Sequence, residues 1–261
     1  MWGHAALMAN SLLASHQRCQ VWYTLPTYND TGPKLKDRFV DADIQELAEL
    51  YLYCDENHTG PIKQPCLYCQ DSKKIISNDA FDILKVFESF YMNEISSFIK
   101  LENANQQYLD IIKDSILFGV TKVVYAPIDR IRINLRIEML KQLHSLNETL
   151  KHKMYVLGGQ ISSVDIFLAS FLIRFERVFS KVLFNNATSL THFAYLKHYL
   201  HQIINDHHLH SLVSFNDIDT FYGSIPGFKF QGTIDNNQLV SSFSKPLTVS
   251  FTHRTLSILN K

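Results

Sequence analysis

Two cysteines separated by two residues are the first feature of the sequence that could do chemistry. They are Cys66 and Cys69 in the segment QPCLYCQD, and the other two cysteines of the chain are Cys19 and Cys54. A Cys-x-x-Cys spacing is typical of redox dithiols and of one half of a zinc site. The alternative is a pair of ordinary thiols on a β-strand.

The flanking residues favour the strand. Pro65 precedes the motif, and DSKK predicts a turn before Ile75 and Ile76. On a strand the two cysteine side chains point to opposite faces, with Cα atoms about 10 Å apart, whereas a disulfide needs less than about 7 Å. No second cysteine pair or Cys/His pair follows at zinc-ligand spacing. We therefore interpret Cys66 and Cys69 as strand thiols, with redox or metal chemistry as the alternative.

Histidines near the C-terminal end of the chain are a second candidate metal site. His198 and His201 share one face of a predicted helix, and His207, His208 and His210 follow just beyond it. No carboxylate or cysteine stands at a matching ligand spacing. We expect no metal here, but a solvated helix end whose histidines suit the helix dipole.

The elements around the cysteines alternate between helix and strand. Helices are predicted over 1–16, 41–54 and 80–90, the last of them starting after Ser77-Asn78-Asp79. Strands are predicted over 18–25, at CLYC and at Ile75-Ile76. This alternation predicts an α/β domain over about the first 95 residues.

From about residue 104 onward the pattern is helical, and no strand is predicted before the tail. The sharpest signal is a capping box of Ser162 and Asp165, with Ile161 and Ile166 placed as a hydrophobic staple around it. Residues 227–261 are polar and rich in Ser and Thr, with weak alternation in PLTVSFT, which predicts a tail or an edge strand.

Composition narrows the function classes. Lys+Arg and Asp+Glu both number 25, so clustered positive charge for a nucleic-acid partner is not expected. The N-terminal segment has no basic n-region, and the apolar run VDIFLASFLI is too short to span a bilayer. We expect a soluble cytoplasmic protein without nucleic-acid or membrane partners.

The order of motifs resembles a known family. In YLYCDENHTGPIKQPCLYCQDSKKIISNDAFDIL, the run through Gln64-Pro65-Cys66-Leu67 to Asn78-Asp79-Ala80 is similar to the cis-proline region of glutathione transferases. It most closely resembles the glutathionyl-hydroquinone reductases, the Xi or omega-like class. GGQISSVDIFLASFLIRFERVF is similar to that family's capping box followed by Arg-Phe-Asp-x-Val-Tyr.

The resemblance covers about residues 1–226. It implies a thioredoxin-like domain over 1–95 with its first strand missing, joined to a glutathione-transferase-type helical domain over 104–226. Residues 227–261 would then form a polar tail.

The resemblance also implies a catalytic cysteine that this sequence does not show. The family nucleophile belongs to a Cys-Pro-Trp-Ala-His motif at the start of the first helix, where the helix N-terminus favours the thiolate. Trp2-Gly3-His4 aligns with Trp-Ala-His, so the cysteine would precede Met1. No catalytic residue is assigned. Trp2 and His4 remain as parts of the motif, and His4 is expected to be a packed or capping residue.

Glutathione is the implied co-substrate, and its contacts would come from Gln64, Pro65, Asp79 and Ala80. Gln64 would act through its main chain if Pro65 is cis, and Asp79 would accept the γ-glutamyl ammonium. Ala80 stands where the family has a serine and cannot donate its hydrogen bond. A tryptophan expected to pack on glutathione is replaced by Pro33.

The implied substrate pocket contains Thr121, Tyr125, Phe179 and Tyr222. Thr121 and Phe179 lack the phenol of the matching family tyrosines, whereas Tyr222 keeps it. Tyr125 lies one helical turn from Thr121 and is a substitute for its missing hydroxyl.

Two functions follow. The first is glutathione-dependent thiol transfer that reduces glutathionyl adducts of hydroquinone type, attenuated because the catalytic cysteine is absent. The second is a non-catalytic binding or assembly module on a glutathione-transferase fold. Whether the chain is an enzyme is therefore left open. The expected partner is a small thiol or quinone adduct, a homodimer is left open, and no metal is expected.

Overall fold

The computed structural model describes residues 1–13, 19–30, 32–39, 43–91, 98–99 and 103–226. The helices are α1 (Trp2–Leu12), α2 (Leu47–Cys54), α3 (Ala80–Tyr91), α4 (Asn103–Ile111), α5 (Phe118–Val124), α6 (Asp129–Leu150), α7 (Ser163–Arg174), α8 (Ser180–Phe184), α9 (Ala194–Asp206) and α10 (Phe215–Ser224). The strands are β1 (Leu67–Cys69), β2 (Lys74–Ser77), β3 (Phe98–Ile99) and β4 (Ile161–Ser162). Two π-helical segments, η2 (Ile112–Leu117) and η3 (Phe175–Phe179), and two 3-10 segments, η4 (Leu190–His192) and η5 (Leu209–Leu212), complete the elements of the described residues.

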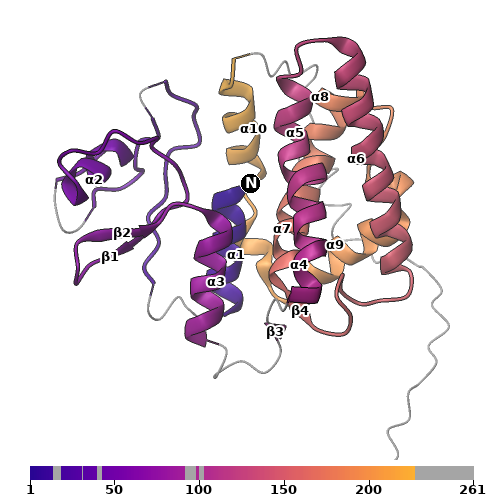
Figure 1. Cartoon of the computed structure of the whole chain (residues 1–261), viewed down its shortest axis with the longest axis horizontal. Helices are drawn as coiled ribbons and strands as arrows, with labels where there is room; N and C mark the ends of the chain where they lie inside the picture. Colours follow the sequence, from indigo (N-terminus) through magenta and orange to yellow (C-terminus); the bar gives the residue numbers. More distant parts are fainter. Residues whose placement is uncertain (14–18, 31, 40–42, 92–97, 100–102, 227–261) are drawn as a thin grey trace, which may run out of the picture.

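These elements form three groups (Figure 1). The helix α2 and the hairpin of β1 and β2 make a small lobe on one side, and the helices α4 to α9 form a bundle on the other. Between them lie α1 and α3, with α10 near the start of the chain. An α/β part followed by a helical part is the fold that the sequence predicts.

Helix α1 belongs to the core of the molecule. Its apolar residues Ala5, Met8 and Ala9 recur at helical spacing and are fully buried. They join one hydrophobic cluster with α3 and with the bundle, whereas a separate small cluster around Leu47 and Leu50 lies in the small lobe. The division into domains 1–95 and 104–226 stays a prediction, but the buried side chains of α1 are continuous with those of the bundle.

The strand expected over 18–25 is not observed as a strand. In the described part of this segment, Thr24 forms an isolated antiparallel bridge with Leu35, and the N–H of Lys36 donates to the carbonyl of Tyr23 at 2.7 Å. β-Favouring side chains make a segment extended, but a strand also needs a neighbour that completes the hydrogen-bonded ladder. The prediction of a full strand is therefore wrong here.

The hairpin expected around the cysteines is confirmed. β1 pairs antiparallel with β2, with Cys69 opposite Lys74, and the intervening turn places Lys73 at a φ of 53°. The helix predicted after it is also confirmed as α3.

In the bundle, the capping box of Ser162 and Asp165 starts α7 as predicted, and Ile161 and Ile166 are both buried. One expectation is corrected here, because β4 pairs in parallel with β3 next to that cap. Two residues are too few to give a periodic signal in a sequence. None of the helices in the described ranges is long and apolar enough to cross a membrane. PLTVSFT falls outside the described residues.

Candidate functional site

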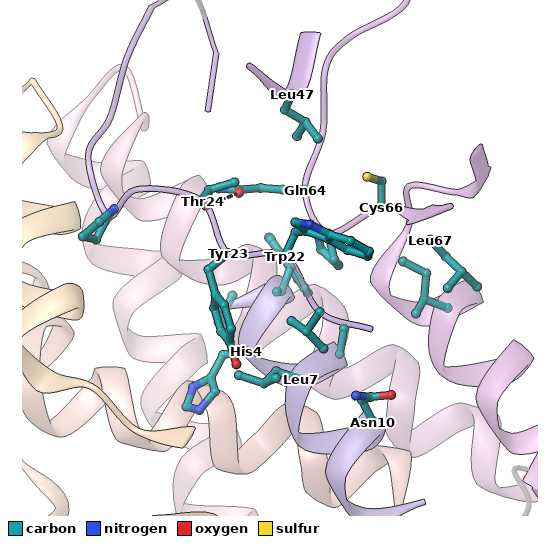
Figure 2. Close-up of a pocket in the computed structure, with 18 of the residues that line it drawn as sticks. His4, Leu7, Asn10, Trp22, Tyr23, Thr24, Leu47, Gln64, Cys66 and Leu67 are labelled. Atoms are coloured by element: carbon teal, nitrogen blue, oxygen red, sulfur yellow. Dashed lines mark hydrogen bonds between the residues drawn. The ribbon is translucent and has the colours of Figure 1, made fainter. Parts of the chain in front are cut away.

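A cavity of about 1160 Å³ separates the small lobe from the central helices. Its walls come from α1, the segments 19–26 and 64–71, α3, α5 and α10. Figure 2 shows Trp22 and Tyr23 projecting from the first of these segments over α1, with Tyr23 directed toward His4. The cavity therefore lies at the junction of the three parts of the fold.

Local contacts hold the segment around Gln64 and Pro65 at the wall of this cavity. The peptide bond between these residues is cis, as the family resemblance requires. The hydroxyl of Thr24 donates to Gln64 Oε1 at 2.9 Å (Figure 2), and the hydroxyl of Tyr51 donates to the carbonyl of Lys63 at 2.9 Å. Both residues expected to contact glutathione here line the cavity.

The other two expected glutathione contacts lie outside the cavity lining. Asp79 caps α3, because its Oδ1 accepts hydrogen bonds from the N–H groups of Phe81 at 2.8 Å and of Asp82 at 3.2 Å. Ala80 is buried in the core. Asp79 itself is exposed, so its carboxylate stays accessible from solvent.

The four residues expected to form a substrate pocket are brought together. Thr121, Tyr125, Phe179 and Tyr222 all line the cavity. The rings of Phe179 and Tyr222 are perpendicular, with centroids 5.4 Å apart. Tyr125 is 70% exposed, so it lies at the rim and not in the wall. Burial raises the pKa of the Tyr222 phenol, although the neighbouring Arg174 lowers it.

The two residues left from the family's catalytic motif have structural contacts. The centroid of the Trp2 ring lies 5.1 Å from that of Phe118 in α5 and 5.7 Å from that of Phe81 in α3. The start of α1 is therefore packed between these two helices. His4 Nδ1 accepts a hydrogen bond from Arg174 Nη1 at 2.9 Å. Burial, followed by Arg174, lowers the pKa of His4 well below its usual range, so the ring is neutral.

Sequence reasoning missed Arg174. It lies at the end of α7, is 8% exposed, and lines the cavity next to His4 and Tyr222. The sequence does contain a cue to this residue, because Arg174 directly follows the apolar run VDIFLASFLI. A cation that continues a buried helical face needs a specific reason to be there.

Three of the four cysteines line the cavity, and all four are free thiols. Burial raises the pKa of Cys19, and it raises the pKa of Cys66 to about 11. Hydrogen bonds from Ser72 lower the pKa of Cys69 instead. The strand placement of this segment agrees with ordinary thiols, and none of the three lies at the start of α1.

The histidines near α9 are divided between the bundle and solvent, because His208 and His210 are exposed. His201 is buried within α9, and His207 Nε2 lies 3.0 Å from the hydroxyl of Tyr155 in a hydrogen bond. No group of three or more His, Cys, Asp or Glu side chains in the described ranges is placed to hold a metal ion.

Comparison with known proteins extends these observations. No family model matches the chain. One curated relative, glutathionyl-hydroquinone reductase YqjG from Escherichia coli (strain K12), is 23% identical over 221 residues. That alignment covers 78% of this chain and 62% of YqjG, so the chain spans less than two thirds of its relative.

Solved structures show the same fold. The glutathione-bound structure of E. coli K-12 YqjG, described as a glutathione transferase homolog, has a TM-score of 0.77 at 21% identity, covering 85% of this chain and 76% of that one. The Xi class glutathione transferase from Natrialba magadii has a TM-score of 0.81 at 19% identity, covering 94% and 78%. ECM4 from Saccharomyces cerevisiae, a Xi glutathione transferase in complex with glutathione, has a TM-score of 0.73 at 15% identity, covering 86% and 85%.

The chain therefore shares its fold with Xi-class glutathione transferases, and its sequence is similar to that of a glutathionyl-hydroquinone reductase over 221 residues. Together these likenesses confirm the resemblance found in the sequence: this protein is a distant relative of the glutathionyl-hydroquinone reductases, with the fold of the Xi-class glutathione transferases.

Proposed function

We propose that this protein binds glutathione in the cavity beside Gln64 and Pro65, and that its thiol-transfer activity on glutathionyl-hydroquinone adducts is attenuated. The observation that carries the proposal is that Gln64 and Pro65 line the same cavity as Trp2 and His4 at the start of α1. Glutathione-bound relatives with the same fold support it.

The expected contact with glutathione is compatible with this sequence. An extended tripeptide pairs with the main chain of the residue before the cis proline, so the side chain at position 64 does not decide binding. The side chain of Gln64 is held by Thr24, which leaves its main chain at the cavity wall. The exposed carboxylate of Asp79 is the proposed partner for the γ-glutamyl ammonium.

Attenuation is proposed from the chemistry of the cavity thiols. A thiolate, and not a thiol, is the attacking species in thiol–disulfide exchange. The raised pKa values of Cys19 and Cys66 keep both protonated near neutral pH. Cys69 has a lowered pKa but lies in the hairpin and not at the start of α1. A cavity whose buried thiols stay protonated lacks the attacking thiolate, and removing a nucleophile typically lowers kcat by several orders of magnitude.

Two measurements test the proposal. Glutathione should raise the melting temperature in proportion to its affinity, because a ligand that binds only the folded state stabilises it. The reduction of a glutathionyl-hydroquinone should then be compared between this chain and a chain with Cys-Pro inserted before Trp2. We expect the insertion to raise the rate at least about 100-fold. Absence of any thermal shift at millimolar glutathione would refute binding.

The second candidate function is a non-catalytic binding or assembly module. It is favoured by two exposed aliphatic side chains one turn apart on α6, Ile133 and Ile137, which are 52% and 47% exposed. Clusters of exposed apolar residues often mark protein interfaces. A homodimer through α6 should appear in sedimentation at micromolar concentration and weaken in Ile133→Lys. We place the protein in the cytoplasm, where thiols stay reduced.

A further inference from the structure

Arg174 is a buried cation whose hydrogen bonds all go to neutral groups. Its Nη1 donates to the carbonyl of Ser170 at 3.0 Å and to His4 Nδ1 at 2.9 Å. Its remaining interaction is with the hydroxyl of Tyr222. Nε has no hydrogen-bond partner among the residues that the structure describes.

None of these neighbours neutralises the guanidinium. His4 is uncharged, because its pKa is lowered well below its usual range. The Tyr222 phenol is also uncharged at neutral pH, because burial raises its pKa. Within the described ranges, Arg174 forms no ion pair with a carboxylate.

Arg177, three residues further on, shows what this fold does with a structural arginine. Its side chain is 1% exposed, and its Nε and Nη2 both bind the carboxylate of Asp219. A buried charge without such a partner is strongly unfavourable. Arg174 therefore differs from Arg177 in having no carboxylate counter-ion among the residues that the structure describes.

The surroundings of Arg174 indicate where a counter-ion would come from. Arg174, His4 and Tyr222 all line the cavity of about 1160 Å³. Tyr222 interacts with the guanidinium, and its ring and the perpendicular ring of Phe179 form an aromatic corner of the cavity wall. A positive charge without a carboxylate partner among the described residues thus lies next to apolar surface.

We propose that Arg174 binds the carboxylate of an aromatic anion whose ring system packs against Phe179 and Tyr222. The carboxylate would form an ion pair with the guanidinium where Arg174 lines the cavity. A monoanion fits better than a phosphate, because one guanidinium with neutral neighbours leaves the second charge of a dianion uncompensated. A neutral aromatic compound would leave the buried cation unpaired.

This site deepens the proposed function by naming a substrate class, namely quinone or other aromatic adducts that carry a carboxylate. Its role in turnover rests on that function. Binding of the anion is independent of that function, because the anion would contact Arg174 and the aromatic corner and not the segment at Pro65.

The test uses 2-naphthoate as the anionic probe and 2-naphthalenemethanol as its neutral counterpart, with each affinity measured by calorimetry on the full chain. We expect the wild-type protein to bind 2-naphthoate at least about tenfold more tightly than the alcohol, the ratio that one charge-assisted hydrogen bond gives. Arg174→Met should abolish this preference. Arg130→Met, which changes an exposed arginine outside the cavity, should keep it.

A second readout separates a binding role from a structural one. Without ligand, Arg174→Met should unfold at a urea concentration close to that of wild type, because the lost hydrogen bonds to Ser170, His4 and Tyr222 offset the removal of a buried charge that has no counter-ion. Arg174→Gln serves in its place if the Met variant does not fold. Equal wild-type affinity for both probes, no binding of either, or an unchanged preference in the neutral variant would overturn the proposal.

Glutathione affinity, measured in the same variants by thermal shift, keeps the two proposals apart. We expect Arg174→Met to leave it unchanged. If the wild-type protein does not bind glutathione but still prefers 2-naphthoate over the alcohol, the proposed function is refuted and the anion site is not.

Discussion

Arg177 and Asp219 join η3 to α10 through a hydrogen bond of 2.7 Å between Nε and Oδ1, and a second bond runs from Nη2 to Oδ2. The arginine is almost fully buried, whereas the carboxylate is 35% exposed. This pair therefore fixes a wall of the cavity, because α10 supplies Tyr222 and Ile218 to its lining.

Asp219→Ala should lower the free energy of unfolding by about 3 kcal/mol, because it leaves the charge of Arg177 buried without a partner. Urea denaturation measures this change. The control is Asp43→Ala, which breaks an ion pair with Arg38 in which both side chains are about 70% exposed. That variant should lose less than about 0.5 kcal/mol. Equal losses in the two variants would contradict the structural role of Arg177.

Asp165→Asn should destabilise the bundle by about 2 kcal/mol, because the new amide would place a donor against existing donors. Asp165 Oδ1 accepts from the N–H of Val156 and the hydroxyl of Tyr199, and Oδ2 accepts from the N–H and hydroxyl of Ser162. Urea denaturation should show this loss. Asp110→Asn, at an exposed position of α4, should show almost none.

The cavity thiols should react with iodoacetamide in a fixed order. At pH 7.5 Cys69 should be labelled first and Cys66 last, because the pKa of Cys69 is lowered and that of Cys66 is about 11. Only the thiolate reacts, so the Cys66 rate should rise about tenfold for each pH unit up to its pKa. Peptide mass spectrometry follows each site. If Cys66 were labelled as fast as Cys69 at pH 7.5, the claim that burial raises the pKa of the Cys66 thiol would be wrong.

Asp79→Asn removes the negative charge at the start of α3 and keeps a side chain that can cap the helix. Asn caps a helix as well as Asp does, so stability should change by less than about 0.5 kcal/mol. Glutathione affinity should fall about two- to fivefold, the effect of losing one exposed ion pair with the γ-glutamyl ammonium. Asp82→Asn, one turn further along the same helix, is the matched control and should bind glutathione normally. An unchanged affinity in Asp79→Asn would remove that residue from the site.

The elements that sequence reasoning predicted are those with short-range signals. The capping box of Ser162 and Asp165 and the cap of α3 by Asp79 join residues a few positions apart, so the sequence displays them directly. The hairpin of β1 and β2 is read from its turn residues in the same way.

The features that it missed depend on distant partners. A strand at 18–25 needed a neighbouring chain to complete its ladder, and the described structure gives it only the bridge from Thr24 to Leu35. Arg174 stands out because no carboxylate of the described part of the chain forms an ion pair with it, and that depends on residues distant in the sequence. Of the four expected glutathione contacts, only Gln64 and Pro65 line the cavity, because Asp79 and Ala80 belong to the start of α3.

The position of α1 limits which N-terminal domains could be joined to this bundle in a chimeric protein. Ala5 and Ala9 are fully buried, and α1 packs against α7 of the bundle as well as against α3. The bundle therefore carries a docking face shaped for small residues from the far N-terminal end of the chain. A chimera that joins this bundle to a foreign N-terminal domain would need to bring alanines at these two positions, since larger side chains would force α1 away from α7.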